Sequence, residues 1–136
     1  MPEIIIRTMQ KDDIEKIVCA FDGPADGGFD NYVTRCYKQN QTRERVSFVA
    51  FVHSEVAGYV HVIFKSAYPY FVERNIPEIN DLRVLPAYRR QGVGKRLLEA
   101  CEKFASANYE HIGLGVGLYK DYGSAQRLYA KSGYVP

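Results

Sequence analysis

One long amphipathic segment constrains the fold of this chain more than any other feature. Between Gly92 and about Asn108, charged side chains alternate with an apolar stripe at helical spacing. The stripe consists of Val93, Leu97, Cys101, Phe104 and Ala105. A strand pattern at 76–84 precedes this helix, and a Gly-punctuated strand pattern at 110–118 follows it. Because a strand, a helix and a strand in this order form a parallel crossover pair, we expect a mixed sheet.

The other segments extend this pattern into an α/β fold of order β-α-α-β-β-β-α-β-α. Periodicity predicts a strand over 3–7, helices from Gln10 to Phe21 and over 29–39, strands over 46–53 and 56–64, and a last helix over 122–132. A tight turn at Ser54-Glu55 would join the two middle strands into a hairpin. Both faces of that hairpin are apolar, so we expect it to lie in the middle of the sheet with both faces covered by other parts of the chain.

Composition and charge limit the function classes. A chain of 136 residues predicts a single domain, 1–136, since domains run to roughly 100–200 residues. A net charge of +2 is too small for a nucleic-acid-binding face. No apolar run approaches the roughly 18 residues of a membrane span, so we expect no membrane partner and a cytoplasmic protein.

Cysteines and histidines give no metal signature. Three cysteines without a CxxC motif argue against disulfides and a zinc site. Cys19 and Cys101 fall on apolar helical stripes and are predicted to be reduced core thiols. The histidines share no ligand spacing, so we expect no metal and core or surface roles for His53, His61 and His111.

A basic, glycine-punctuated turn lies between the strand ending at Val84 and the long helix. Backbone N–H groups in the first turn of a helix lack partners, and the helix dipole favours an anion there. Two glycines remove Cβ atoms from this turn, and four cations gather at it: Arg89, Arg90, Lys95 and Arg96. The pattern predicts a phosphate or pyrophosphate site; the alternative is a basic helix start on a solvated face.

Two familiar phosphate motifs do not fit this turn. A P-loop requires glycine where Arg89 stands and Ser or Thr where Arg96 stands. A dinucleotide fingerprint requires a third glycine at Leu97 and no proline between strand and turn, where this chain has Pro86.

A resemblance to a known family indicates which ligand this phosphate site would bind. The run Arg89–Gly94 resembles the R/Q-x-x-G-x-G/A pyrophosphate loop of the GNAT superfamily of N-acetyltransferases, and it follows that family's L-x-V-x-P strand end. The run Ala125–Tyr134 is similar to the family's A-x-x-L-Y-x-K-x-G-F helix. Together the motifs have the family's order and separation, and the resemblance covers essentially the whole chain.

The resemblance implies transfer of an acetyl group from acetyl-CoA to a primary amine of a small molecule or peptide, by direct attack and without a metal. The pyrophosphate would lie on the turn, and the pantetheine arm would pair with the preceding strand. This implies cofactor-binding residues Leu82, Arg83, Val84, Arg89, Arg90, Gln91, Gly92, Val93, Gly94 and Lys95. A backbone N–H of the strand would polarise the thioester carbonyl.

The resemblance also implies three catalytic candidates. Glu78 lies eleven residues before Arg89, the spacing of the family's general base, and Asp81 is its rival. Regular alternation would place Glu78 on one face with Asn80 and Leu82, opposite Asp81. Glu78 could instead be a solvated charge at a strand start. Tyr129 fits the tyrosine that protonates the departing thiolate, or it is a packed helix residue.

The chain departs from the family pattern at two places. Tyr122 occupies the position of an asparagine that contacts the cofactor, and its hydroxyl could substitute as a donor. Family domains usually continue into two further strands, so we expect a fold lacking these strands and a C-terminally truncated chain. A non-catalytic acyl-CoA-binding or sensor domain therefore stays an alternative, and many relatives are dimers, which allows a homodimer. The loops at 23–30 and 66–75 are expected to shape the acceptor pocket.

Overall fold

A five-stranded mixed sheet organises the protein. The computed structural model describes residues 3–21, 28–64, 76–108 and 113–114. The sheet order is β1-β2-β3-β4-β5, with β1 at Ile4–Thr8, β2 at Arg45–Val52, β3 at Glu55–Ile63, β4 at Glu78–Val84 and β5 at Gly113–Leu114. The first four strands pair antiparallel, while β4 and β5 pair parallel. The predicted mixed sheet and crossover are therefore confirmed.

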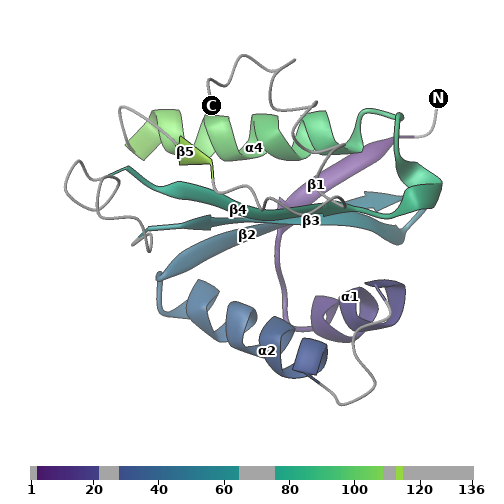
Figure 1. Cartoon of the computed structure of the whole chain (residues 1–136), viewed down its shortest axis with the longest axis horizontal. Helices are drawn as coiled ribbons and strands as arrows, with labels where there is room; N and C mark the ends of the chain where they lie inside the picture. Colours follow the sequence, from purple (N-terminus) through teal and green to yellow (C-terminus); the bar gives the residue numbers. More distant parts are fainter. Residues whose placement is uncertain (1–2, 22–27, 65–75, 109–112, 115–136) are drawn as a thin grey trace.

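Helices cover both faces of this sheet. Helices α1 (Asp13–Phe21) and α2 (Gly28–Gln41) lie on one face, and α4 (Val93–Asn108) lies on the other (Figure 1). The middle strands β2 and β3 are consequently buried along most of their length, as the sequence predicted. A short 3₁₀ turn at Pro86–Tyr88, which the sequence analysis did not foresee, links β4 to the turn before α4.

Two apolar cores result, one on each face of the sheet. The core beneath α4 contains the predicted stripe residues Val93, Leu97 and Cys101 together with buried side chains of β2, β3 and β4. The opposite core is formed by Ile17 and Phe21 of α1, Phe29 and Val33 of α2, and the intervening residues of β2 and β3. Each helix thus buries the apolar face that its periodicity defines.

A buried ion pair fixes the start of α1 on the sheet. The Asp13 carboxylate is fully buried and accepts hydrogen bonds from both terminal nitrogens of Arg7, at 2.6 and 2.8 Å. It also accepts the backbone N–H of Gln10 at 2.8 Å. Arg7 belongs to β1, so this carboxylate ties the first turn of the helix to the edge strand.

Some element bounds and the position of one cysteine differ from the sequence predictions. The hairpin turn is at His53-Ser54, one residue earlier than expected, because both residues adopt positive φ (52° and 66°), as two-residue hairpins require. Strand β4 begins at Glu78 rather than Ile76. Cys19 is exposed rather than in the core, because α1 buries Asp13, Ile17 and Phe21. Cys101 is buried as predicted.

The C-terminal predictions lie largely outside the described residues. Of the strand expected at 110–118, only Gly113–Leu114 is described. The helix expected at 122–132 lies entirely outside the described residues. Over the residues that are described, none of the helices has the length and apolar character needed to cross a membrane.

Candidate active site

A β-bulge in β4 determines which side chains reach the face beneath α1 and α2. Tyr59 pairs with Arg83, but His61 pairs with Asn80, so β4 carries one extra residue between these pairs. Asp81 lies in this interval and adopts a φ of 53°, the left-handed region that a bulge can impose. The strand therefore does not alternate regularly at this point.

The bulge brings both candidate carboxylates to one face. The Asn80 amide donates to Glu78 at 2.7 Å, so these two share a face as expected. Ile79 and, contrary to expectation, Leu82 pack in the core beneath α4, so Glu78 and Asn80, on either side of Ile79, point to the face beneath α1 and α2. Asp81 points to that same face, where it bonds to Tyr32 and Tyr59. The prediction that Asp81 faces away from Glu78 is wrong, because it assumed an unbroken pleat.

Asp81 is held by two tyrosine hydroxyls. Tyr32 of α2 donates to Asp81 Oδ2 at 2.9 Å, and Tyr59 of β3 donates to the same oxygen at 3.0 Å. Among the described residues, none donates a hydrogen bond to Asp81 Oδ1. Burial raises the pKa of Asp81, and the two hydroxyls oppose that rise. Burial, followed by the charge of Asp81, raises the pKa of each tyrosine, so both stay protonated donors.

Arg83 presents its guanidinium on this same face. Its central carbon lies 4.9 Å from the ring centroid of Phe21, 5.8 Å from that of Phe29 and 6.0 Å from that of Tyr59. Its Nη1 also donates to the Tyr59 hydroxyl at 3.3 Å. The side chain is nevertheless exposed to solvent. The family resemblance implied only a backbone role in cofactor binding for Arg83.

A buried histidine lies next to these tyrosines. His61 Nδ1 is 2.6 Å from Ser47 Oγ, and its Nε2 is 3.9 Å from Cys36 Sγ. Burial lowers the pKa of His61 to about 3, so its ring is neutral. Burial also raises the pKa of Cys36, which keeps the thiol protonated and unsuited to nucleophilic attack. The expected core role of a histidine is confirmed for His61.

Glu78 is not the solvated strand-start charge of the alternative interpretation. Its side chain is only 3% exposed at the beginning of β4. Two further predicted residues, Tyr122 and Tyr129, lie outside the described residues, as does most of both loops expected to shape the acceptor pocket.

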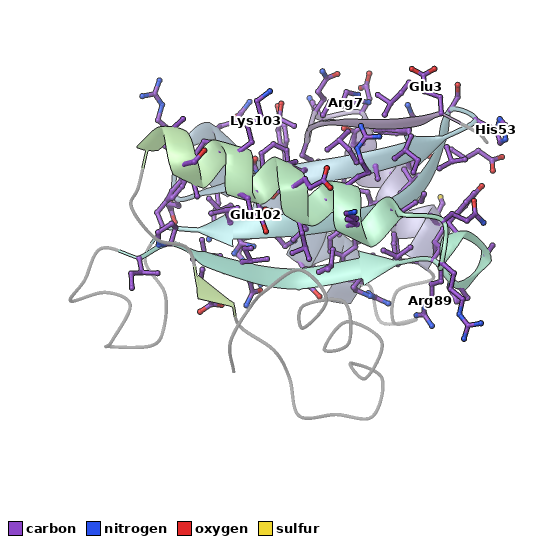
Figure 2. The ribbon with its side chains drawn as sticks, turned by 90° about the horizontal axis from the view of Figure 1, so that it is seen from above. Glu3, Arg7, His53, Arg89, Glu102 and Lys103 are labelled. Carbon is purple, nitrogen blue, oxygen red and sulfur yellow. The ribbon has the colours of Figure 1, made fainter. Side chains whose placement is uncertain are left out.

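The basic turn lies at the other end of β4. Arg89 Nε donates to the Val84 carbonyl at 3.2 Å, and the Tyr88 hydroxyl donates to Glu55 at 3.0 Å, so the turn is tied to both β4 and the β2–β3 hairpin. Arg89 projects outward beside the first turn of α4 (Figure 2). The exposed residues here are Arg89, Arg90, Gln91, Gly92, Lys95 and Arg96.

The backbone of the turn is open to an approaching group. Gly92 has a φ of 87°, and a Cβ added to it would meet nothing within 4 Å. The first helical hydrogen bond runs from the Arg96 N–H to the Gly92 carbonyl at 3.0 Å. The preceding N–H groups of α4 therefore point out of the helix end, where an anion is favoured. Of the predicted turn residues, Val93 is buried in the core and can contribute only its backbone.

The tyrosines and the bulge were not predicted from the sequence. Tyr32 and Tyr59 fall within the helix predicted at 29–39 and the strand predicted at 56–64, but nothing in those local patterns assigns them to a site. A register shift arises from pairing between β3 and β4, so neither strand alone reveals it.

Comparisons with known proteins agree with this architecture. Residues 14–134 match the sequence profile described as the Acetyltransferase (GNAT) family. The chain belongs to the GNAT acetyltransferase family. A search among curated proteins finds no match.

Solved structures share the GNAT fold at low identity. A ribosomal-protein-alanine N-acetyltransferase from Brucella melitensis biovar Abortus 2308 is 16% identical, with a TM-score of 0.73 over 98% of this chain and 93% of that one. An aminoglycoside 6′-N-acetyltransferase from Acinetobacter haemolyticus is 13% identical, with a TM-score of 0.78 over 97% and 91%. A predicted acetyltransferase from Clostridium acetobutylicum, solved with acetyl-CoA, is 16% identical, with a TM-score of 0.71 over 98% and 91%.

Proposed function

We propose that this GNAT acetyltransferase moves an acetyl group from acetyl-CoA to a primary amine of a small molecule or peptide, by direct attack of the amine. The observation that carries the proposal is that one segment holds both groups: β4 contains a carboxylate bound by two tyrosines, and the turn after β4 is basic and open. The two relatives named for their acceptors act on an aminoglycoside and on a ribosomal protein, which supports an amine acceptor.

The basic turn suits the pyrophosphate of acetyl-CoA. Open space above Gly92 allows an anion to reach the backbone, and the N–H groups of Val93 to Lys95 supply donors. Arg89, Arg90 and Lys95 add positive charge at the surface of the turn. The Clostridium relative solved with acetyl-CoA supports this choice of ligand. When bound, acetyl-CoA supplies an activated thioester.

Asp81 is our candidate for the general base. The amine must lose a proton in order to form the new C–N bond. As the amine attacks, negative charge moves to the thioester oxygen, and the C–S bond breaks when the carbonyl re-forms, so that CoA leaves as a thiolate. Asp81 Oδ1 would take this proton, because both tyrosines donate to Oδ2. The raised pKa of Asp81 strengthens it as a base. Glu78 is less suited, because it is buried and accepts the Asn80 amide.

Two further roles remain predictions from the family resemblance. A backbone N–H of Leu82–Val84 would stabilise the negative charge that develops on the thioester oxygen. Tyr129 would give its hydroxyl proton to the departing CoA thiolate, since the pKa values of a phenol and a thiol are about 10 and 8.5.

The test is acetyl transfer by the full chain, measured as release of CoA thiol and as product mass across a panel of primary amines. Asp81→Asn should lower kcat/KM by about 10²–10⁴-fold, the usual contribution of a general base. Asp12→Asn, which removes an exposed carboxylate near α1, is the matched control and should leave kcat/KM unchanged. If Glu78→Gln abolishes transfer while Asp81→Asn does not, the base is assigned wrongly. Acetyl-CoA binding without transfer to any amine would instead indicate a non-catalytic acyl-CoA-binding domain.

A further inference from the structure

We propose that the acceptor carries a carboxylate close to its reactive amine, as a free α-amino acid does, and that Arg83 binds this carboxylate while Asp81 receives the amine. This inference rests on the proposed function and narrows its acceptor class. It concerns the face beneath α1 and α2, on which the side chains of Asp81 and Arg83 both lie.

Positive charge surrounds Asp81 on this face. The guanidinium groups of Arg83 and Arg45 both act electrostatically on its carboxylate. A third guanidinium, that of the exposed Arg35, lies 5.6 Å from the ring centroid of Tyr32, whose hydroxyl bonds to Asp81. A polycationic acceptor would meet repulsion from these three groups. An acceptor with one ammonium and one anionic group would find a partner for each.

The other described carboxylates near this face are already engaged or face solvent. Asp13 is bound by Arg7, and Glu78 accepts the Asn80 amide. Asp30 lies exposed in the first turn of α2. Among the described carboxylates named here, Asp81 is therefore the one that bonds to Tyr32 and Tyr59 and on which the charges of Arg83 and Arg45 act.

The spacing of the two charges suits a small dipolar head group. The Tyr59 hydroxyl donates to Asp81 Oδ2 at 3.0 Å and accepts from Arg83 Nη1 at 3.3 Å, so one oxygen atom bridges the carboxylate and the guanidinium. The ammonium and the carboxylate of an α-amino acid are held close together by the single carbon atom between them. In the proposed complex, the nitrogen of such a molecule contacts Asp81 and its carboxylate contacts Arg83.

Arg83 is oriented for recognition. Three aromatic rings, from α1, α2 and β3, lie beside the guanidinium, and the hydroxyl of Tyr59 fixes one of its nitrogens. A planar guanidinium has five N–H donors, whose fork geometry matches a carboxylate. The side chain is still exposed, so a molecule from solvent can reach it. Because the rings limit its motion, less rotamer entropy is lost when a carboxylate binds.

The experiment compares matched acceptors in the acetyl-transfer assay with the full chain. Each pair consists of an L-amino acid and its carboxamide, for several side chains, at equal concentration of free amine. The wild-type protein should acetylate the amino acid with a kcat/KM about ten- to hundredfold above that of the amide, the usual effect of one charge-assisted hydrogen-bonded pair.

Substitutions at Arg83 show whether this residue causes the preference. Arg83→Gln should raise KM for the amino acid about ten- to hundredfold and leave KM for the amide within about twofold. Arg83→Lys, which keeps the charge but not the fork, should give an intermediate KM. Lys38→Gln removes an exposed positive charge from α2 and should leave both values unchanged. Thermal unfolding of each variant checks that the fold is kept.

Three results would overturn the inference, and they can be told apart. Equal use of amino acid and amide by the wild-type protein would contradict it alone. An equal loss of activity toward both acceptors in Arg83→Gln would show that Arg83 is only structural. Failure to acetylate any amine would contradict the proposed function, and this inference with it.

Discussion

The ion pair at the start of α1 gives a stability prediction whose size follows from the structure. Asp13→Asn keeps the shape of the side chain but removes its charge. The substitution leaves the Arg7 guanidinium without its carboxylate and disturbs the bond from the Gln10 N–H. Breaking a buried pair on one side costs about 3–5 kcal/mol. Because the Arg7 side chain is 33% exposed, water compensates part of this loss, and we expect about 3 kcal/mol.

Urea and thermal unfolding monitored by circular dichroism measure this loss. For a chain of this length, about 3 kcal/mol corresponds to a fall in Tm of roughly 10 °C. Asp12→Asn, at the exposed neighbouring position, is the control and should change the unfolding free energy by less than about 0.5 kcal/mol. In a double-mutant cycle, Arg7→Met and Asp13→Asn together should cost less than the sum of the single changes. A loss below about 1 kcal/mol in Asp13→Asn would refute the reasoning.

Three further predictions concern the bulged strand and the turn that follows it. Gly92→Ala should cost about 1 kcal/mol of unfolding free energy from its φ of 87° alone, since its Cβ meets open space; an unchanged urea midpoint would contradict this. Gly58→Ala should cost more, about 1–3 kcal/mol, because its Cβ would lie 2.7 Å from the Arg83 carbonyl oxygen; a smaller loss than in Gly92→Ala would argue against this packing. Tyr32→Phe removes a hydroxyl that opposes the raised pKa of Asp81, so the acidic limb of the kcat/KM profile should move to higher pH, and a shift to lower pH would exclude Asp81 as the base.

Elements with a local signature were predictable from the sequence. Helix α4 followed from its apolar stripe: Val93, Leu97, Cys101 and Phe104 pack in the core or against it, and Ala105 is buried. The glycine turn followed from its position between a strand and that helix. Both depend on residues close together in the chain, so spacing alone reveals them.

Features that depend on pairing between distant segments were not predictable. The bulge at Asp81 arises from the register between β3 and β4, and it reverses the face expected for that carboxylate. The tyrosines that hold Asp81 lie 49 and 22 residues away from it along the chain. The exposure of Cys19 was not predictable for a similar reason. The side of α1 that is buried depends on how this helix packs on the sheet, and Cys19 lies on the other side.

The central claim is that the turn at 89–95 binds acetyl-CoA, and calorimetric titration of acetyl-CoA into the protein tests it most directly. Arg89→Ala removes a cation from the turn, and Gly92→Glu places a negative side chain in the open space above it. The account predicts saturable binding by the wild-type protein and a collapse of affinity in both variants. Absence of binding by the folded wild-type protein, or undiminished binding by Gly92→Glu, would contradict it.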